Sequence, residues 1–170
     1  MITNFKIFEK VSDYNINRIV NGNYETILDF LLKNNADVNK KDDYTNRTPL
    51  INAARNYNLS MVKKLLNAKA EVNSIDRFGY TALLSAVGNI QWELGLNLDD
   101  PGVKIDENII KLSFDIIIEL IKHNADWTIT LDDKCILDYL NDKYRNILFE
   151  MFPDKFNDYI IAKDAEIYNL

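Results

Sequence analysis

The sequence predicts an all-α solenoid of about four stacked helix–turn–helix units, closed by a C-terminal capping helix, with a long insertion in the third unit. Three observations support this prediction. A five-residue motif recurs three times, an apolar pair precedes each copy at one spacing, and a Thr-Pro-Leu run recurs as Thr-Ala-Leu about 33 residues later. Self-similarity at a period of about 20–50 residues is typical of solenoids, propellers and repeat arrays.

The recurring motif has the form Asn/Lys-Ala-Asp/Glu followed by an apolar residue and Asn or Thr. In every copy, the first residue of the apolar pair lies five positions before the Ala. The copies are 35–39, 69–73 and 124–128, and the pairs are 31–32, 65–66 and 120–121. Three copies in the same register indicate three related structural units.

The second unit shows how each unit is expected to fold. Thr48 is a good N-cap, and Pro49 suits the first position of a helix. Tyr57 and Asn58 interrupt this helix, and Gly79 supplies the turn that precedes the next unit. Apolar side chains fall at i, i+3 and i+4 in both helices, namely Leu50, Ala53 and Ala54, then Val62, Leu65 and Leu66.

The pattern resembles the ankyrin repeat, whose usual form is D-x-x-G-x-T-P-L-H-x-A-A, then V-x-x-L-L, then G-A-D-V-N. Residues 46–54 and 76–86 match its first part, although Asn46 stands in the Gly position and Ile51 in the His position. The resemblance is strong over 24–90 and good over 116–128. It implies a solenoid of paired helices that binds other proteins and catalyses no reaction.

We expect a single domain over 1–170 whose terminal units are atypical, because terminal repeats meet solvent on one side. The first unit has Ile16, Ile19 and Val20 on its inner face, and the fourth has Cys135 in the Thr position. The expected segments are an N-terminal capping repeat (1–39), a second repeat (40–73), a third repeat (74–128), a degenerate fourth repeat (129–152) and a C-terminal cap (153–170). In that cap, Phe156, Tyr159, Ile160 and Ile167 are expected to face inward.

The third unit is longer than the second. The separation from Leu83 to Leu120 exceeds that from Leu50 to Leu65, which places an insertion between its two helices, around 91–112. Asp106 is expected to cap a lengthened second helix over 107–122. Insertions of this kind usually lie on one face of a solenoid and often contact partners.

Composition excludes several classes of function. The 170 residues carry 26 acidic and 20 basic side chains, a net charge of −6, which disfavours nucleic acid and anionic membranes as partners. A single histidine, His123, rules out a two-histidine metal site, and a single cysteine cannot form an internal disulfide. We therefore expect no metal, no cofactor and, with no visible targeting segment, a cytoplasmic protein.

Two isolated reactive side chains are interpreted as structural. His123 lies at the end of the long helix, where the dipole favours a cation, and Cys135 is expected to be a small buried apolar residue. Tyr44, Arg77, Phe78 and Tyr80 fall on turns between units. They could pack on neighbouring turns, or they could form a row of interface anchors, since aromatic and Arg side chains are enriched at binding hot spots.

The resemblance implies binding through a concave surface made of turn tips and first helices. The candidate contact residues are Tyr44, Arg47, Asn52, Arg55, Asn56, Arg77, Phe78, Tyr80, Ser85 and Asn89. The expected partner is another protein, and the free chain is expected to be a monomer. One alternative is an immunity protein that neutralises a basic toxin such as a nuclease, which a charge of −6 would favour. Others are a host-directed effector, a viral adaptor, or an enzyme that uses Cys135.

Overall fold

The helices follow one another in pairs along the chain. This computed structural model describes residues 16–95 and 106–168, although the side chains of 90–95 and 162–168 lie outside the description. Within these ranges it contains no strand, and the only extended pairing is an isolated bridge between Leu131 and Lys134. The helices are α2 (Ile16–Asn21), α3 (Glu25–Lys33), α4 (Pro49–Arg55), α5 (Leu59–Asn67), α6 (Ala82–Gly95), α7 (Glu107–Lys122), α8 (Ile136–Tyr139), α9 (Asp142–Met151) and α10 (Pro153–Tyr168).

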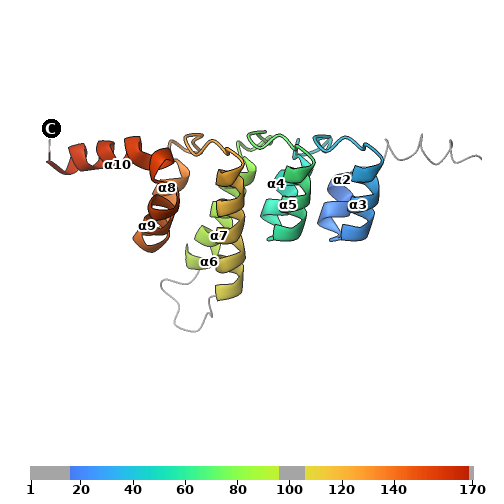
Figure 1. Cartoon of the computed structure of the whole chain (residues 1–170), viewed down its shortest axis with the longest axis horizontal. Helices are drawn as coiled ribbons and strands as arrows, with labels where there is room; N and C mark the ends of the chain where they lie inside the picture. The colour runs from blue at the N-terminus through green and yellow to red at the C-terminus, as the bar shows by residue number, and fades with distance from the viewer. Residues whose placement is uncertain (1–15, 96–105, 169–170) are drawn as a thin grey trace, which may run out of the picture.

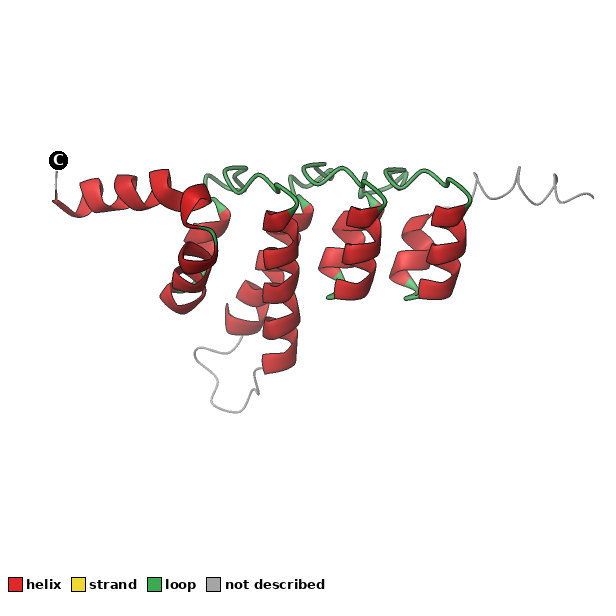
Figure 2. Cartoon of the chain, in the orientation of Figure 1, coloured by secondary structure: helices red, strands yellow, loops and turns green. Residues whose placement is uncertain are grey.

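The helical pairs stand side by side in one row, and the turns that join successive pairs lie together along one edge (Figures 1 and 2). Each pair therefore contacts its neighbours in the row, as in a solenoid. This arrangement confirms the predicted all-α solenoid of stacked helix–turn–helix units. None of the described helices is both long and apolar enough to cross a membrane.

The predicted helix starts are confirmed by side-chain caps. The Thr48 hydroxyl accepts a hydrogen bond from the Ile51 N–H at 3.3 Å, and Thr81 accepts one from the Leu84 N–H at 3.1 Å. Between α4 and α5, Tyr57 adopts a positive φ of 57°, a conformation that ends a helix. Asn58 then caps α5 by accepting from the Met61 N–H at 3.0 Å. These caps supply partners for backbone N–H groups that helix ends leave unpaired.

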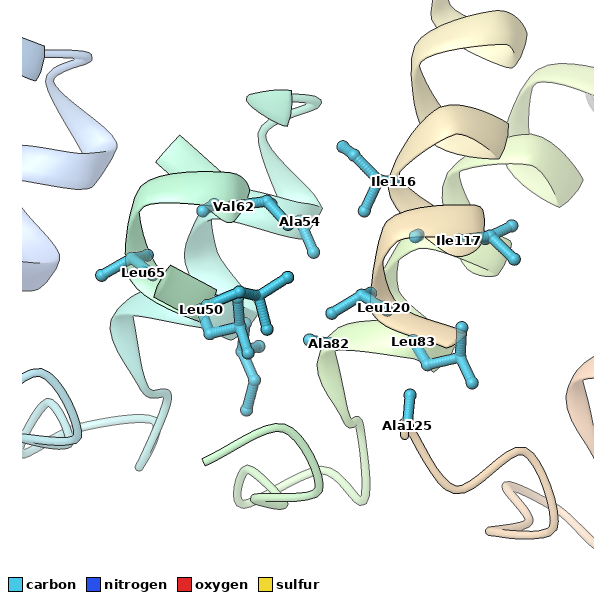
Figure 3. Packing of buried hydrophobic residues seen from close by; sticks show 14 of the residues in the cluster. Leu50, Ala54, Val62, Leu65, Ala82, Leu83, Ile116, Ile117, Leu120 and Ala125 are labelled. Atoms are coloured by element: carbon cyan, nitrogen blue, oxygen red, sulfur yellow. The ribbon is translucent and has the colours of Figure 1, made fainter. Parts of the chain in front are cut away.

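One continuous apolar core runs through the stack (Figure 3). Leu50 and Leu65 of the second pair and Leu83 and Leu120 of the third are all buried within it. The buried small residues Ala53, Ala54 and Ala82 allow the neighbouring helices to approach closely. The i, i+3, i+4 pattern of the sequence thus marks the face along which successive pairs pack.

Polar side chains set the register between the first and second pairs. Each bond joins residues 35 positions apart, so equivalent positions of the two pairs lie opposite each other. The bonds are Asn52 to Asn17 (2.8 Å), Asn56 to Asn21 (3.1 Å), Asn58 to Asn23 (2.5 Å), Ser60 to Glu25 (2.9 Å) and Lys64 to Asp29 (2.7 Å).

The third pair extends beyond its neighbours. In Figure 1, α6 and α7 continue past the ends of α4 and α5, on the side away from the turns. The predicted second helix over 107–122 is confirmed, and the Asp106 carboxylate accepts from the Asn108 N–H at 2.9 Å. Of the predicted insertion, 91–95 belong to α6 and 107–112 to α7, whereas 96–105 lie outside the described residues.

The C-terminal helix packs on the fourth unit through aromatic side chains, and the Tyr159 ring lies 6.0 Å from that of Trp127. Phe156 is fully buried, and its ring lies 5.3 Å from that of Trp127 and 5.8 Å from that of Phe149. Tyr159 and Ile160 are only half-buried, and α10 runs outward from α9 along the direction of the row (Figure 1). The inward position of Ile167 lies outside the described side chains. Among the described side chains of α10, Phe156 and Tyr159 contact the aromatic rings of Trp127 and Phe149.

Candidate functional site

The predicted contact residues, Asn52 excepted, fall into two groups on the turn edge and the inner helices. The tip cluster consists of Tyr44, Arg47, Arg77 and Phe78, which lie on the turns before α4 and α6. The inner hollow is a cavity of about 350 Å³ between α4 and α6. It is lined by Arg55, Asn56, Tyr57, Tyr80, Ser85, Gly88 and Asn89.

A buried carboxylate shapes the second of the two turns. One oxygen of Asp76 accepts hydrogen bonds from the backbone N–H groups of Phe78 at 2.8 Å and Tyr80 at 2.9 Å. Gly79, between them, has a φ of +86°, which side-chain-bearing residues adopt only with strain. The turn therefore presents the Phe78 ring to solvent from a fixed backbone, with 54% of the residue exposed.

Arg47 joins this turn to the one before it. Its Nε donates to the other oxygen of Asp76 at 3.0 Å, and its guanidinium lies 5.5 Å from the centroid of the Phe78 ring. The Arg77 backbone N–H donates to the Thr45 carbonyl at 2.9 Å, which ties the same turns together a second time. Tyr44 is 82% exposed, more than Phe78.

The first turn depends on a second carboxylate, Asp42. It accepts from the backbone N–H groups of Tyr44 (3.0 Å), Thr45 (2.7 Å) and Arg47 (3.0 Å), and also from the Thr45 hydroxyl. Partial burial acts to raise the pKa of Asp42, but these four hydrogen bonds outweigh it and lower the pKa below its usual value. The charged carboxylate thus holds Tyr44 and Arg47 in place.

The end of α4 is fixed where it borders the inner hollow. The Asn89 amide donates to the carbonyl oxygens of Ala54 at 3.2 Å and Arg55 at 3.3 Å. Asn56 is the C-cap of α4 and donates to Asn21 of the preceding pair. Because helix ends leave carbonyl groups unpaired, these bonds stabilise the segment that carries Arg55.

The structure buries two of the predicted contact residues, Asn52 and Ser85, but only Ser85 lines the inner hollow. Asn52 is buried, donates to Asn17 and holds the register between the first two pairs. Since its amide is engaged within the stack, we leave it out of the surface that we propose. Sequence reasoning missed Tyr57, Gly88 and the exposed Ile75 beside the tip cluster. Gly88 was detectable as a glycine within an otherwise helical pattern.

His123 and Cys135 both lie at helix ends. His123 is the C-cap residue of α7, and its Nδ1 lies 2.9 Å from the Glu119 carbonyl oxygen. Cys135 precedes α8, is half-buried rather than fully buried, and its backbone N–H donates to Asp138 at 2.9 Å. Burial is the largest influence on the Cys135 thiol and raises its pKa, which disfavours the thiolate that a nucleophile needs. Across the described residues, no three His, Cys, Asp or Glu side chains group together to hold a metal ion.

Comparison with known proteins agrees with this geometry. A family model described as ankyrin repeats (3 copies) matches residues 16–95, which span α2 to α6. Residues 16–95 consist of ankyrin repeats. The matched repeats contain both the tip cluster and the inner hollow. A search of curated protein sequences finds no significant match.

Solved ankyrin-repeat structures share the fold. The ankyrin repeat domain of Bcl-3, described as a unique member of the IkappaB protein family, is 25% identical with a TM-score of 0.60. The alignment covers 78% of this chain and 50% of that one. An ankyrin repeat domain from Acinetobacter baumannii AYE is also 25% identical, with a TM-score of 0.58 and coverage of 77% and 57%. The chain thus spans only about half the length of these structures.

Proposed function

We propose that the chain binds a partner protein through the tip cluster and the inner hollow. Ankyrin repeats are generally protein–protein interaction modules, and solenoids of this type use extended concave surfaces for binding. The observation that carries the proposal is the exposure of Tyr44 and Phe78 on turns that Asp42 and Asp76 hold rigid. Rigid aromatic anchors bind with little loss of conformational entropy.

The tip cluster has the composition of a binding hot spot. Arg47 and Arg77 accompany the two aromatic rings, and Tyr and Arg are enriched among residues that dominate binding energy. Arg47 lies against Phe78 and is paired with Asp76, so its guanidinium is already ordered before a partner arrives. In this proposal, the ankyrin repeats act as a preformed scaffold and catalyse no reaction.

The test begins with a partner captured from the native source and identified by mass spectrometry, then purified for affinity measurements. Phe78→Ala should weaken binding by roughly 1–4 kcal/mol, as hot-spot truncations do. Lys63→Ala is the matched control, because Lys63 is exposed on α5, the outer helix of the second repeat. It should leave both affinity and melting temperature unchanged.

A second variant locates the site. Replacing 91–112 by a tight turn should leave affinity nearly intact, since α6 and α7 extend from the stack on the side opposite the turns (Figure 1). Loss of binding in this variant, with full affinity retained by Phe78→Ala, would place the site on the extension and overturn the proposal.

A basic toxin is a second candidate partner, which the net charge of −6 favours. The proposed surface itself carries positive charges, in contrast to the net charge of the chain, because Arg47, Arg55 and Arg77 lie on it. Binding of a basic partner should weaken with added salt, mainly through slower association. Unchanged association rates between low and high salt would exclude this candidate.

A further inference from the structure

Gly88 lies within α6, where glycine is among the least favourable residues because of its backbone entropy. Among the described side chains, a Cβ at this position would meet only Tyr80 Cε1, at 3.9 Å, which is ordinary van der Waals contact. No close neighbour therefore requires glycine at this position. What glycine does provide is open space in the wall of the inner hollow.

Ser85 lies one helical turn before Gly88 on the same side of α6 and also lines the inner hollow. The residue is only 4% exposed, and its hydroxyl has no hydrogen-bond partner among the described residues. A buried polar group without a partner destabilises a folded protein. Two locally unfavourable residues thus face the same cavity, and such departures are expected at functional sites.

Arg55 supplies a positive charge at the rim of the inner hollow. Its side chain is exposed, and no carboxylate among the described side chains lies within 4 Å of it. Arg47 and Arg145 do have such partners, in Asp76 and Asp142, whereas Arg18 and Arg77 resemble Arg55 in having none among the described side chains. The bonds from Asn89 to the end of α4 hold the backbone of Arg55 in place.

From these features we propose that the inner hollow accepts an acidic side chain, Asp or Glu, from the partner protein. The carboxylate would pair with the Arg55 guanidinium, and the aliphatic part would lie against the Tyr80 ring, over Gly88. A cavity of about 350 Å³ is ample for one side chain. This inference rests on the proposed function and specifies what the surface recognises.

The test uses two small probes that differ only in charge, N-acetyl-glutamate N-methylamide and N-acetyl-glutamine N-methylamide. Each is titrated into the 170-residue chain at low ionic strength and followed by two-dimensional NMR of the backbone amides. The glutamate probe should shift the amides of Ser85, Gly88 and Asn89 saturably, with a Kd of about 1–10 mM. The glutamine probe should produce no saturable shift.

Two variants should weaken binding of the glutamate probe, one by removing the charge and the other by filling the cavity. Arg55→Gln removes the charge and should weaken the glutamate probe at least about tenfold, the size of a lost charge-assisted hydrogen bond. Gly88→Leu fills the cavity and should weaken it by a similar factor, while leucine preserves the helix. Lys63→Gln is the control: it removes one charge from outside the hollow and should change the Kd by less than about twofold.

The inference is overturned if the glutamate probe causes no saturable shift at these amides, or if Arg55→Gln leaves its Kd unchanged. Affinity measurements with the purified partner distinguish failure of this inference from failure of the proposed function. If Phe78→Ala weakens the partner but Arg55→Gln does not, the surface binds protein without using the hollow in this way. If neither variant affects the partner although the glutamate probe binds, the proposed function fails.

Discussion

Arg47 Nε lies 3.0 Å from Asp76 Oδ2, so a charged pair bridges the turns that open the second and third repeats. The Asp76 side chain is fully buried, whereas that of Arg47 is 18% exposed. The buried Asp76 carboxylate therefore depends on protein groups to stabilise its charge, whereas the Arg47 guanidinium can also contact water. This asymmetry predicts unequal consequences when either partner is removed.

Arg47→Met should cost roughly 3–5 kcal/mol, because it leaves the Asp76 carboxylate buried without its cation. The value should lie near the lower end, since the N–H groups of Phe78 and Tyr80 still donate to Asp76. In the double variant Arg47→Met/Asp76→Asn, part of this loss should be recovered, because no buried charge is left. Urea unfolding of the single and double variants gives the coupling energy. Strictly additive effects would mean that the two side chains do not stabilise each other.

Acidification should weaken the first turn through Asp42. Its pKa is lowered on folding, so the stabilisation is complete above the unfolded value of 3.8 and is lost as the pH falls through the folded value. Asp42→Asn should therefore lower the free energy of unfolding by more at pH 6 than below pH 3. Asp43→Asn is the control, because the exposed Asp43 accepts none of these hydrogen bonds. An equal difference at both pH values would contradict this role for Asp42.

The stack should be sensitive to cavities between well-matched repeats. Leu65→Ala should cost roughly 2–5 kcal/mol, because Leu65 is buried in the continuous core. Lys63→Ala, two positions away on the same helix, should change stability by less than about 0.5 kcal/mol. Thermal or urea unfolding of both variants checks the contrast. A small effect of Leu65→Ala would show that the helices close around the missing side chain.

The C-terminal helix should protect the fourth repeat through Phe156. Phe156→Ala should cost roughly 3–5 kcal/mol, because the fully buried ring lies against Trp127 and Phe149. Ile161→Ala, on an exposed position of α10, should be nearly neutral. Removing 154–170 should expose the rings of Trp127 and Phe149 and promote aggregation. A truncated protein that stays monomeric with unchanged melting would refute the capping role.

The local signals were sufficient for the helices. Thr48 was predicted as an N-cap and Asp106 as the start of the long helix, and both side chains accept the expected hydrogen bonds. Capping and the i, i+3, i+4 pattern act within a few residues, so the sequence determines them directly. The direction of α10 could not be derived from such local signals. It depends on which side chains of the fourth repeat contact this helix.

Contacts between repeats were decided by tertiary structure. The sequence by itself determined that Arg55, Ser85 and Asn89 belong to inner helices, but only packing of α4 against α6 brought them around one cavity with Gly88. The same packing buried Asn52 against Asn17, 35 residues away, although its helical position alone suggested a surface residue. A helix determines which of its side chains share a face. Whether that face meets solvent, a cavity or a neighbour depends on the distance at which the next repeat packs.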